Sequence, residues 1–143
     1  MKTPALVALS FGFFGIGAAL AAPVAQAQVQ PTAITSAVLS RGYNPRTFEP
    51  SGVTSSFKSF TGKIHCTATM NRFGTVTAGS VWIAVDAGGK HNYAFLQSTL
   101  PKQKGRIIHF AASLPRPWPA GKYRVDLFLN GKLVRSIPYT VTS

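Results

Sequence analysis

Two histidines, His65 and His109, are the residues of this sequence best suited to binding chemistry. His65 lies between Ile64 and Cys66, and His109 likewise lies between two apolar residues. Because side chains alternate between the two faces of a strand, an apolar inner face would turn both imidazoles outward. On neighbouring strands the pair could hold a transition metal, although two ligands without a carboxylate or thiolate make a weak site. The alternative is a pair of solvated surface histidines.

The groups that catalysis needs are scarce. The carboxylates Glu49, Asp86 and Asp126 lie in separate segments, and the sequence contains no paired acid, nucleophile elbow or metal-binding motif. Cys66 is the sole cysteine and lies on the apolar side of an alternating segment, which predicts a buried, unpaired thiol rather than a nucleophile. We therefore expect a protein that is not an enzyme and that needs no cofactor.

Basic residues dominate the charge of the chain, with fifteen Lys and Arg against three Asp and Glu. Such a field attracts acidic glycans, anionic lipid headgroups or nucleic acid. The residues that could bind an anionic ligand are Lys102, Lys104, Arg106, Arg116 and Trp118. The Trp118 indole would serve as a stacking platform for a sugar. The alternative for Trp118 is packing over one end of the domain, between rigid prolines.

The first 27 residues have the pattern of a signal peptide. Lys2 supplies the positive start, residues 6–20 form an apolar run, and Ala25-Gln26-Ala27 is a small-residue cleavage signal. Cleavage after Ala27 would leave residues 28–143, one domain with a formal charge of +11 and no integral membrane segment. We expect the mature protein to be periplasmic or secreted.

Short apolar runs rich in β-branched and aromatic residues recur between clusters of Gly, Pro, Asn and Ser, and no segment shows a sustained helical period. This pattern predicts an all-β domain. The expected strands cover residues 33–40, 62–71, 80–87, 92–99, 106–113, 122–130 and 132–141. A long connection between the first two has room for a short extra strand around 54–60.

Three residues give these strands a family resemblance. Cys66 falls in the second strand, Trp82 in the third, and Tyr123 opens the sixth within a Gly-Lys-Tyr-Arg-Val run. In order and spacing this resembles an immunoglobulin-like sandwich of exported bacterial proteins, with Tyr123 as its tyrosine corner. The resemblance implies about seven antiparallel strands in two sheets, with the two histidine strands side by side. It also implies a binding or assembly module. Val125 stands where a second cysteine would form the intersheet disulfide.

The last two strands form a hairpin, because Asn130-Gly131 is typical of a type I′ turn. Such a turn makes Phe128 face Leu133, Leu127 face Val134 and Asp126 face Arg135. If Leu127 points into the core, Phe128 and Leu133 form an apolar outer face.

A second strand has apolar residues on both faces and would extend this surface. In strand 80–87 the set that contains Ile83 alternates with another apolar set, so one of them must face outward. Tyr93, on the next strand, would join the patch or cover it. The candidate interface residues are therefore Phe128, Leu133, Ile83 and Tyr93, and the alternative is that a loop covers them.

Three candidate functions follow from these features. The favoured one is an exported, non-catalytic binding or assembly module that docks a protein partner, or a second copy of itself, through its apolar sheet face. The first alternative is a binder of anionic polymer driven by positive charge, and the second is a weak periplasmic metal-binding protein that uses His65 and His109.

Overall fold

The computed structural model describes residues 32–143, with the backbone alone described at 101–104. The predicted signal peptide and its cleavage point lie outside these residues. Every regular element among the described residues is a β-strand, which confirms the all-β class. No helix in this part of the chain is long and apolar enough to cross a membrane.

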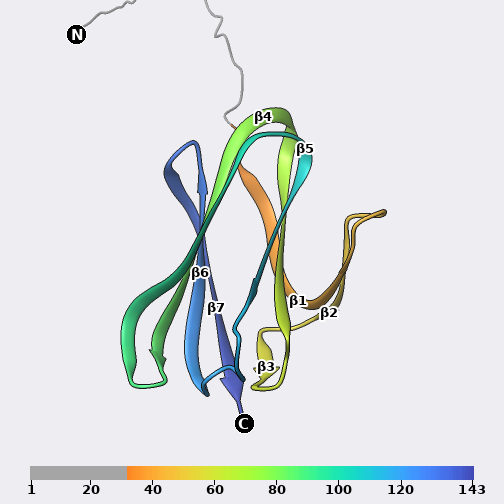
Figure 1. Ribbon diagram of the computed structural model, residues 1–143. Coiled ribbons are helices and arrows are strands. Elements are labelled where there is room, and N and C mark those ends of the chain that lie inside the picture. Colours follow the sequence, from red (N-terminus) through yellow and green to blue (C-terminus); the bar gives the residue numbers. More distant parts are fainter. Residues whose placement is uncertain (1–31) are drawn as a thin grey trace, which may run out of the picture. The chain divides into compact units, whose positions relative to one another are not determined.

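The strands differ widely in length, and the two longest lie in the middle of the chain (Figure 1). The strands are β1 (Ile34–Asn44), β2 (Glu49–Val53), β3 (Ser56–Lys58), β4 (Lys63–Ala87), β5 (Lys90–Ser113), β6 (Gly121–Leu129) and β7 (Lys132–Thr142). β3 falls within the short extra strand expected around 54–60.

β4 and β5 each belong to two packed layers. The first half of β4 pairs with β1 on one side and with the second half of β5 on the other. The second half of β4 pairs with the first half of β5 and with β6, and β6 pairs with β7. These are the strand neighbourhoods of an immunoglobulin-like sandwich, which keeps its A, B and E strands in one sheet and its C, F and G strands in the other. Figure 1 shows β4 and β5 arching over together at one end.

Four of the expected strands are joined in pairs into two long strands. The expected strands 62–71 and 80–87 are one strand, β4, and the expected strands 92–99 and 106–113 are one strand, β5. Instead of ending, the β4–β5 ladder bends through register shifts between Thr69 and Gly74 and between Val76 and Ala78. The two layers are therefore one folded sheet. One pairing, β3 with β7, is parallel rather than antiparallel.

The core lies between the layers and contains the residues on which the family resemblance rests. Cys66, Trp82 and Val125 have no exposed surface. Cys66 is a free thiol, as predicted, and burial raises its pKa to about 12. The Tyr123 hydroxyl donates a hydrogen bond of 2.6 Å to the carbonyl oxygen of Pro119, which is the bond expected of a tyrosine corner.

The β6–β7 hairpin has the predicted turn but not the full predicted register. Asn130 and Gly131 take positive φ angles of 51° and 81°, and Phe128 lies opposite Leu133. The register then shifts between Phe128 and Leu127, because β7 contains one extra residue there, Val134. The predicted pairs Leu127 with Val134 and Asp126 with Arg135 are therefore wrong, since such a bulge displaces every later partner by one position.

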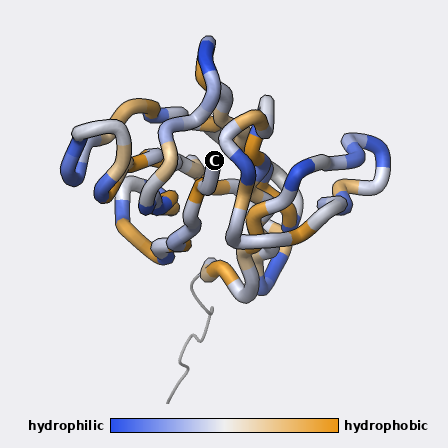
Figure 2. Tube along the Cα trace, turned by 90° about the horizontal axis from the view of Figure 1, so that it is seen from below, coloured by the Kyte–Doolittle hydropathy of each residue, from blue (hydrophilic) through white to orange (hydrophobic). Residues whose placement is uncertain are grey.

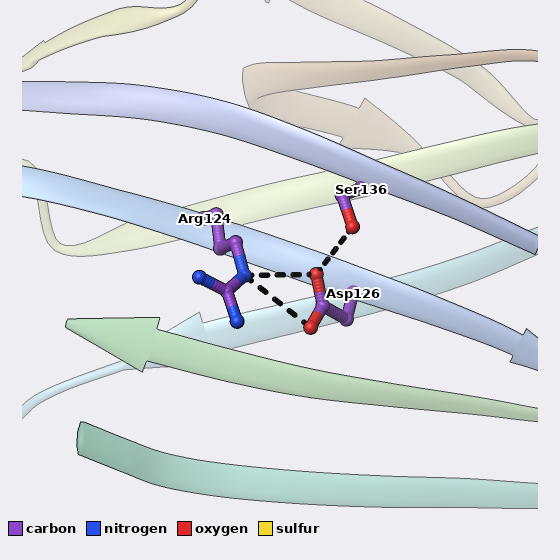
Figure 3. A network of polar contacts seen from close by, with 3 residues as sticks. All are labelled: Arg124, Asp126 and Ser136. Carbon is purple, nitrogen blue, oxygen red and sulfur yellow. Dashed lines mark hydrogen bonds and ion pairs between the residues drawn. The ribbon is translucent and has the colours of Figure 1, made fainter. Parts of the chain in front are cut away.

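The bulge gives Asp126 a different set of partners. Ser136 lies opposite Asp126 and donates a hydrogen bond of 2.7 Å to its Oδ1 atom. Arg124 Nε lies 3.1 Å and 3.3 Å from the two carboxylate oxygens (Figure 3). Arg135, freed from Asp126, donates to the carbonyl oxygen of Ile34 at 3.1 Å. The bulge thus ties the end of the chain to the start of β1.

Candidate binding site beneath the β1–β2 hairpin

The β1–β2 hairpin folds back over the outer face of the layer formed by β1, β4 and β5. β1 pairs with β4 as far as Ser40 and with β2 from Ser40 onward, so the hairpin leaves the layer at that residue. Beyond it, Tyr43 stacks on His109 of β5, which brings the hairpin back across β4. The hairpin projects to the right in Figure 1, and Figure 2 shows hydrophilic residues at its tip.

His65 and His109 meet beneath this hairpin, on neighbouring strands as expected. His65 Nδ1 lies 2.8 Å from His109 Nε2, so one ring donates a hydrogen bond and the other accepts it. The two rings are stacked with 24° between their planes. Within residues 32–143, no group of three His, Cys, Asp or Glu residues could hold a metal ion. The predicted metal site therefore rests on two ligands and stays a prediction.

The surroundings of both imidazoles favour the neutral form. Burial lowers the pKa of His65, and the nearby positive charge of Lys63 lowers it further. Burial is also the largest cause that lowers the pKa of His109, followed by the charges of His65 and Lys63. A neutral pair is the state in which one ring can donate and the other can accept.

Thr67 is a further polar residue of this face. It lies directly opposite His109 across the β4–β5 ladder. Its side chain is buried, and its hydroxyl has no hydrogen-bond partner within the described residues. A buried hydroxyl without a partner costs free energy, so the site carries an unmet polar group next to the histidine pair.

An open slot lies beside the histidines, between the hairpin tip and the bent part of β4 and β5. The slot has a volume of about 440 Å³ and is lined by Phe48, Thr69, Phe73, Gly105, Arg106 and Ile107. Two of these side chains, Phe48 and Phe73, are 52% and 73% exposed. Phe48 is positioned by a tight turn, because its N–H donates to the carbonyl oxygen of Asn44 at 2.7 Å and its φ is 62°.

Arg106 gives the slot a positive charge. Its guanidinium carbon lies 5.8 Å from the centre of the Phe73 ring, within the range of a cation–π contact. Its Nε donates to the carbonyl oxygen of Met70 at 3.2 Å. Among residues 32–143, Asp126 is ion-paired with Arg124 and Asp86 lies 3.5 Å from His91, and no carboxylate pairs with Arg106. An anionic group could approach it without displacing an existing ion pair.

The structure does not gather the four predicted interface residues into one patch. Phe128 is half-buried and Leu133 exposed, and they lie side by side. Ile83 is buried opposite Arg124, next to the polar group that holds Asp126. Tyr93 lies opposite Ala84, next to the partner of Ile83, but it lines a small cavity with Phe95 and Tyr123 at one end of the core rather than joining the patch. The apolar surface of this outer face is therefore limited to Phe128, Leu133 and the bulge.

The predicted anion-binding residues are also dispersed. Arg106 lines the slot, whereas Arg116 lines the small cavity that also contains Tyr93. Trp118 is 1% exposed and packs edge-on against Tyr123, so its indole is not available to stack on a sugar. The side chains of Lys102 and Lys104 lie outside the described part of the structure.

Sequence reasoning missed three residues of the site, Tyr43, Phe48 and Phe73. The first two belong to a stretch rich in Pro, Gly and Ser, and the third to the expected gap between two strands. One feature of the sequence could have indicated them. A large aromatic residue within a polar connection is either covered by another part of the protein or bound by a partner.

No protein-family model and no curated protein matches the chain. A solved structure of the alkylpurine DNA glycosylase AlkC from Pseudomonas fluorescens, bound to DNA containing an abasic site analog, aligns with a TM-score of 0.49 and 13% identity. That alignment covers 78% of this chain, which spans only 30% of the glycosylase. An immunoglobulin-like protein from Pseudomonas aeruginosa aligns with a TM-score of 0.48 and 12% identity, over 82% of this chain and 99% of its own. Likeness at this level carries no information on ligand or activity.

Proposed function

We propose that this protein is an exported, non-catalytic binding module that docks a partner protein at the slot beneath the β1–β2 hairpin. The observation that carries the proposal is the slot itself, an apolar recess lined by two exposed phenylalanines and by an arginine that has no carboxylate partner among residues 32–143. Aromatic residues and arginine are the side chains most enriched where proteins bind one another.

The slot is a better docking surface than the outer face of β6 and β7 that the sequence favoured. On that face Ile83 is buried and Asp126, itself only 8% exposed, is bonded to Arg124 and Ser136. A partner would have to cover a polar group whose hydrogen bonds are already made. At the slot, by contrast, covering Phe48 and Phe73 removes apolar surface from water, which is favourable.

The charge of the protein indicates the kind of partner. Beyond residue 27 the chain carries fourteen basic and three acidic residues. Two of the acidic residues are already paired, Asp86 with His91 and Asp126 with Arg124. A partner with an acidic surface around an apolar side chain would therefore match both the charge and the slot.

The test is capture of partner proteins from an envelope extract by wild-type protein and by two matched variants. Phe73→Ser removes a slot residue, and Phe60→Ser removes a phenylalanine that is 79% exposed and does not line the slot. We expect the same partner with wild type and Phe60→Ser, its loss with Phe73→Ser, and the same pattern when the partner is purified. The proposal fails if both variants capture equally and binding disappears as salt rises, because that is the behaviour of a charge-driven polymer binder.

A further inference from the structure

The second half of β5 is a sheet edge without a neighbour. In residues 32–143, β5 pairs with β4 alone, so residues 106–113 have β4 on one side and no strand on the other. The described residues also make no other backbone hydrogen bond to this segment. Half of its N–H and C=O groups therefore point away from the sheet, where an incoming strand could bond to them.

This edge lacks the features by which proteins block unwanted strand pairing. β2 is short and carries Glu49 and Pro50, and β3 has three residues, one of them Lys58. The first half of β5 is interrupted by a register shift where Ile83 pairs with Ala94. Residues 107–112, Ile-Ile-His-Phe-Ala-Ala, contain no proline and no Lys, Arg, Asp or Glu. This segment is therefore better suited to pairing with another chain than β2, β3 or the first half of β5.

The free edge runs directly into the slot. Gly105, Arg106 and Ile107 line the slot, and the last two of them begin the unpaired segment of β5. Alternate side chains of an added strand would lie on the outer face of the layer, where the slot and Phe73 are. Backbone pairing and side-chain insertion would thus be made by one extended segment, as in other cases of strand addition.

The basic residues near the free edge of β5 indicate which kind of strand would bind there. Lys102 and Lys104 come shortly before the unpaired segment in sequence, and Arg106 is its first residue. An antiparallel added strand would bring the residues at its C-terminal end beside this basic stretch. Acidic residues are favoured there, whereas a second copy of this chain would bring another charge of +11 to the interface.

We propose that an extended segment of the partner protein adds to the free edge of β5 as an antiparallel strand, with acidic residues at the end that lies beside Arg106. This inference rests on the proposed function and specifies how the partner is bound. An antiparallel strand is favoured because β5 already pairs antiparallel with β4 and parallel pairing is slightly weaker per residue.

Three synthetic peptides test the direction and the mode of binding with the mature protein. The first alternates threonine and valine and ends in a run of glutamates, the second begins with the same glutamates, and the third is the first with prolines in place of alternate valines. We expect the first peptide to bind about tenfold more tightly than the second, which corresponds to a preference of about 1.4 kcal/mol, and the third not to bind. Binding of the first should slow amide hydrogen exchange in residues 106–113.

The outcomes separate this inference from the proposed function. Equal binding of the proline peptide, or binding that leaves exchange in residues 106–113 unchanged, overturns strand addition. Absence of binding by all three peptides overturns it as well, while Phe73-dependent capture of a natural partner would leave the slot proposal standing. If the protein alone sediments as a dimer with residues 106–113 protected, a second copy occupies the edge and the acidic partner is excluded.

Discussion

The phenol ring of Tyr43 lies flat on the imidazole of His109, with ring centroids 3.7 Å apart and 9° between the planes. His109 is in turn hydrogen-bonded to His65, so the β1–β2 hairpin packs against a pair of linked histidines. The histidine pair is therefore part of the contact that positions the hairpin over the layer.

Acidification should destabilise the protein through the histidine pair. The pKa values of His65 and His109 are lowered on folding, so the unfolded chain binds more protons as pH falls below the ordinary histidine value of about 6.5. The contribution of the two histidines to the free energy of unfolding is therefore fully present above about pH 6.5. It is lost as the pH falls through their lowered pKa values. Urea unfolding as a function of pH should show this loss.

Two variants check the assignment of that pH dependence. His109→Gln should reduce it, because glutamine does not titrate and only His65 then contributes. His91→Gln is the matched control for a histidine outside the stack, since His91 is exposed and lies 3.5 Å from Asp86. An unchanged profile in His109→Gln would show that other groups are responsible.

Removal of the tyrosine-corner hydroxyl should lower stability. Tyr123→Phe keeps the buried ring and deletes the 2.6 Å hydrogen bond to Pro119, which should cost about 0.5–1.5 kcal/mol. Tyr93→Phe is the matched control, because that ring is half exposed and its hydroxyl makes no hydrogen bond to the described residues that would be lost. Chemical denaturation of both variants measures the difference, and equal midpoints would contradict the role given to the Tyr123 hydroxyl.

The two faces of the β6–β7 hairpin should respond differently to substitution. Leu127→Ala should cost about 2–5 kcal/mol, because Leu127 is buried in the core and its truncation leaves a cavity. Leu133→Lys should change the free energy of unfolding little, because that side chain is already 52% exposed. Thermal melting of the two variants compares them directly. Equal destabilisation would mean that Leu133 is part of the core.

Gly121 is a position that accepts no side chain. Its φ is 149°, and an added Cβ would lie 2.7 Å from the Ala87 Cβ and against the Asp86 carbonyl oxygen. Gly121→Ala should therefore move the start of β6 and cost more than Gly89→Ala, where φ is also positive but nothing lies within 4 Å. Unfolding midpoints of the two variants measure the difference, and equal losses would contradict the clash at Gly121.

Much of the fold follows from local patterns in the sequence. Asn130-Gly131 specifies its turn by backbone geometry alone, and Cys66 is buried because apolar residues alternate around it. The continuity of β4 and β5 does not follow in this way. Gly74, Gly79 and Pro101 are residues that commonly end strands, and here the strands bend through them because pairing on both sides of the bend holds the chain extended.

The site was less accessible to sequence reasoning than the fold. The proximity of His65 and His109 was predictable because a sandwich topology places their strands side by side. Phe48 and Phe73 come together only when the hairpin folds back over the layer, and no local pattern records that contact. The bulge at Val134 could not be predicted either. The turn sets the register of the hairpin only as far as the bulge, where an extra residue changes it.

The shared strands β4 and β5 also bear on how the chain folds. The short turn between Ala87 and Lys90 joins two strands that pair almost from end to end, so their hairpin can close progressively from that turn with little loss of loop entropy. β1 and β6 can then add to opposite halves of one preformed ribbon. The ribbon that supports the binding slot in the native state would thus be the template on which both layers assemble.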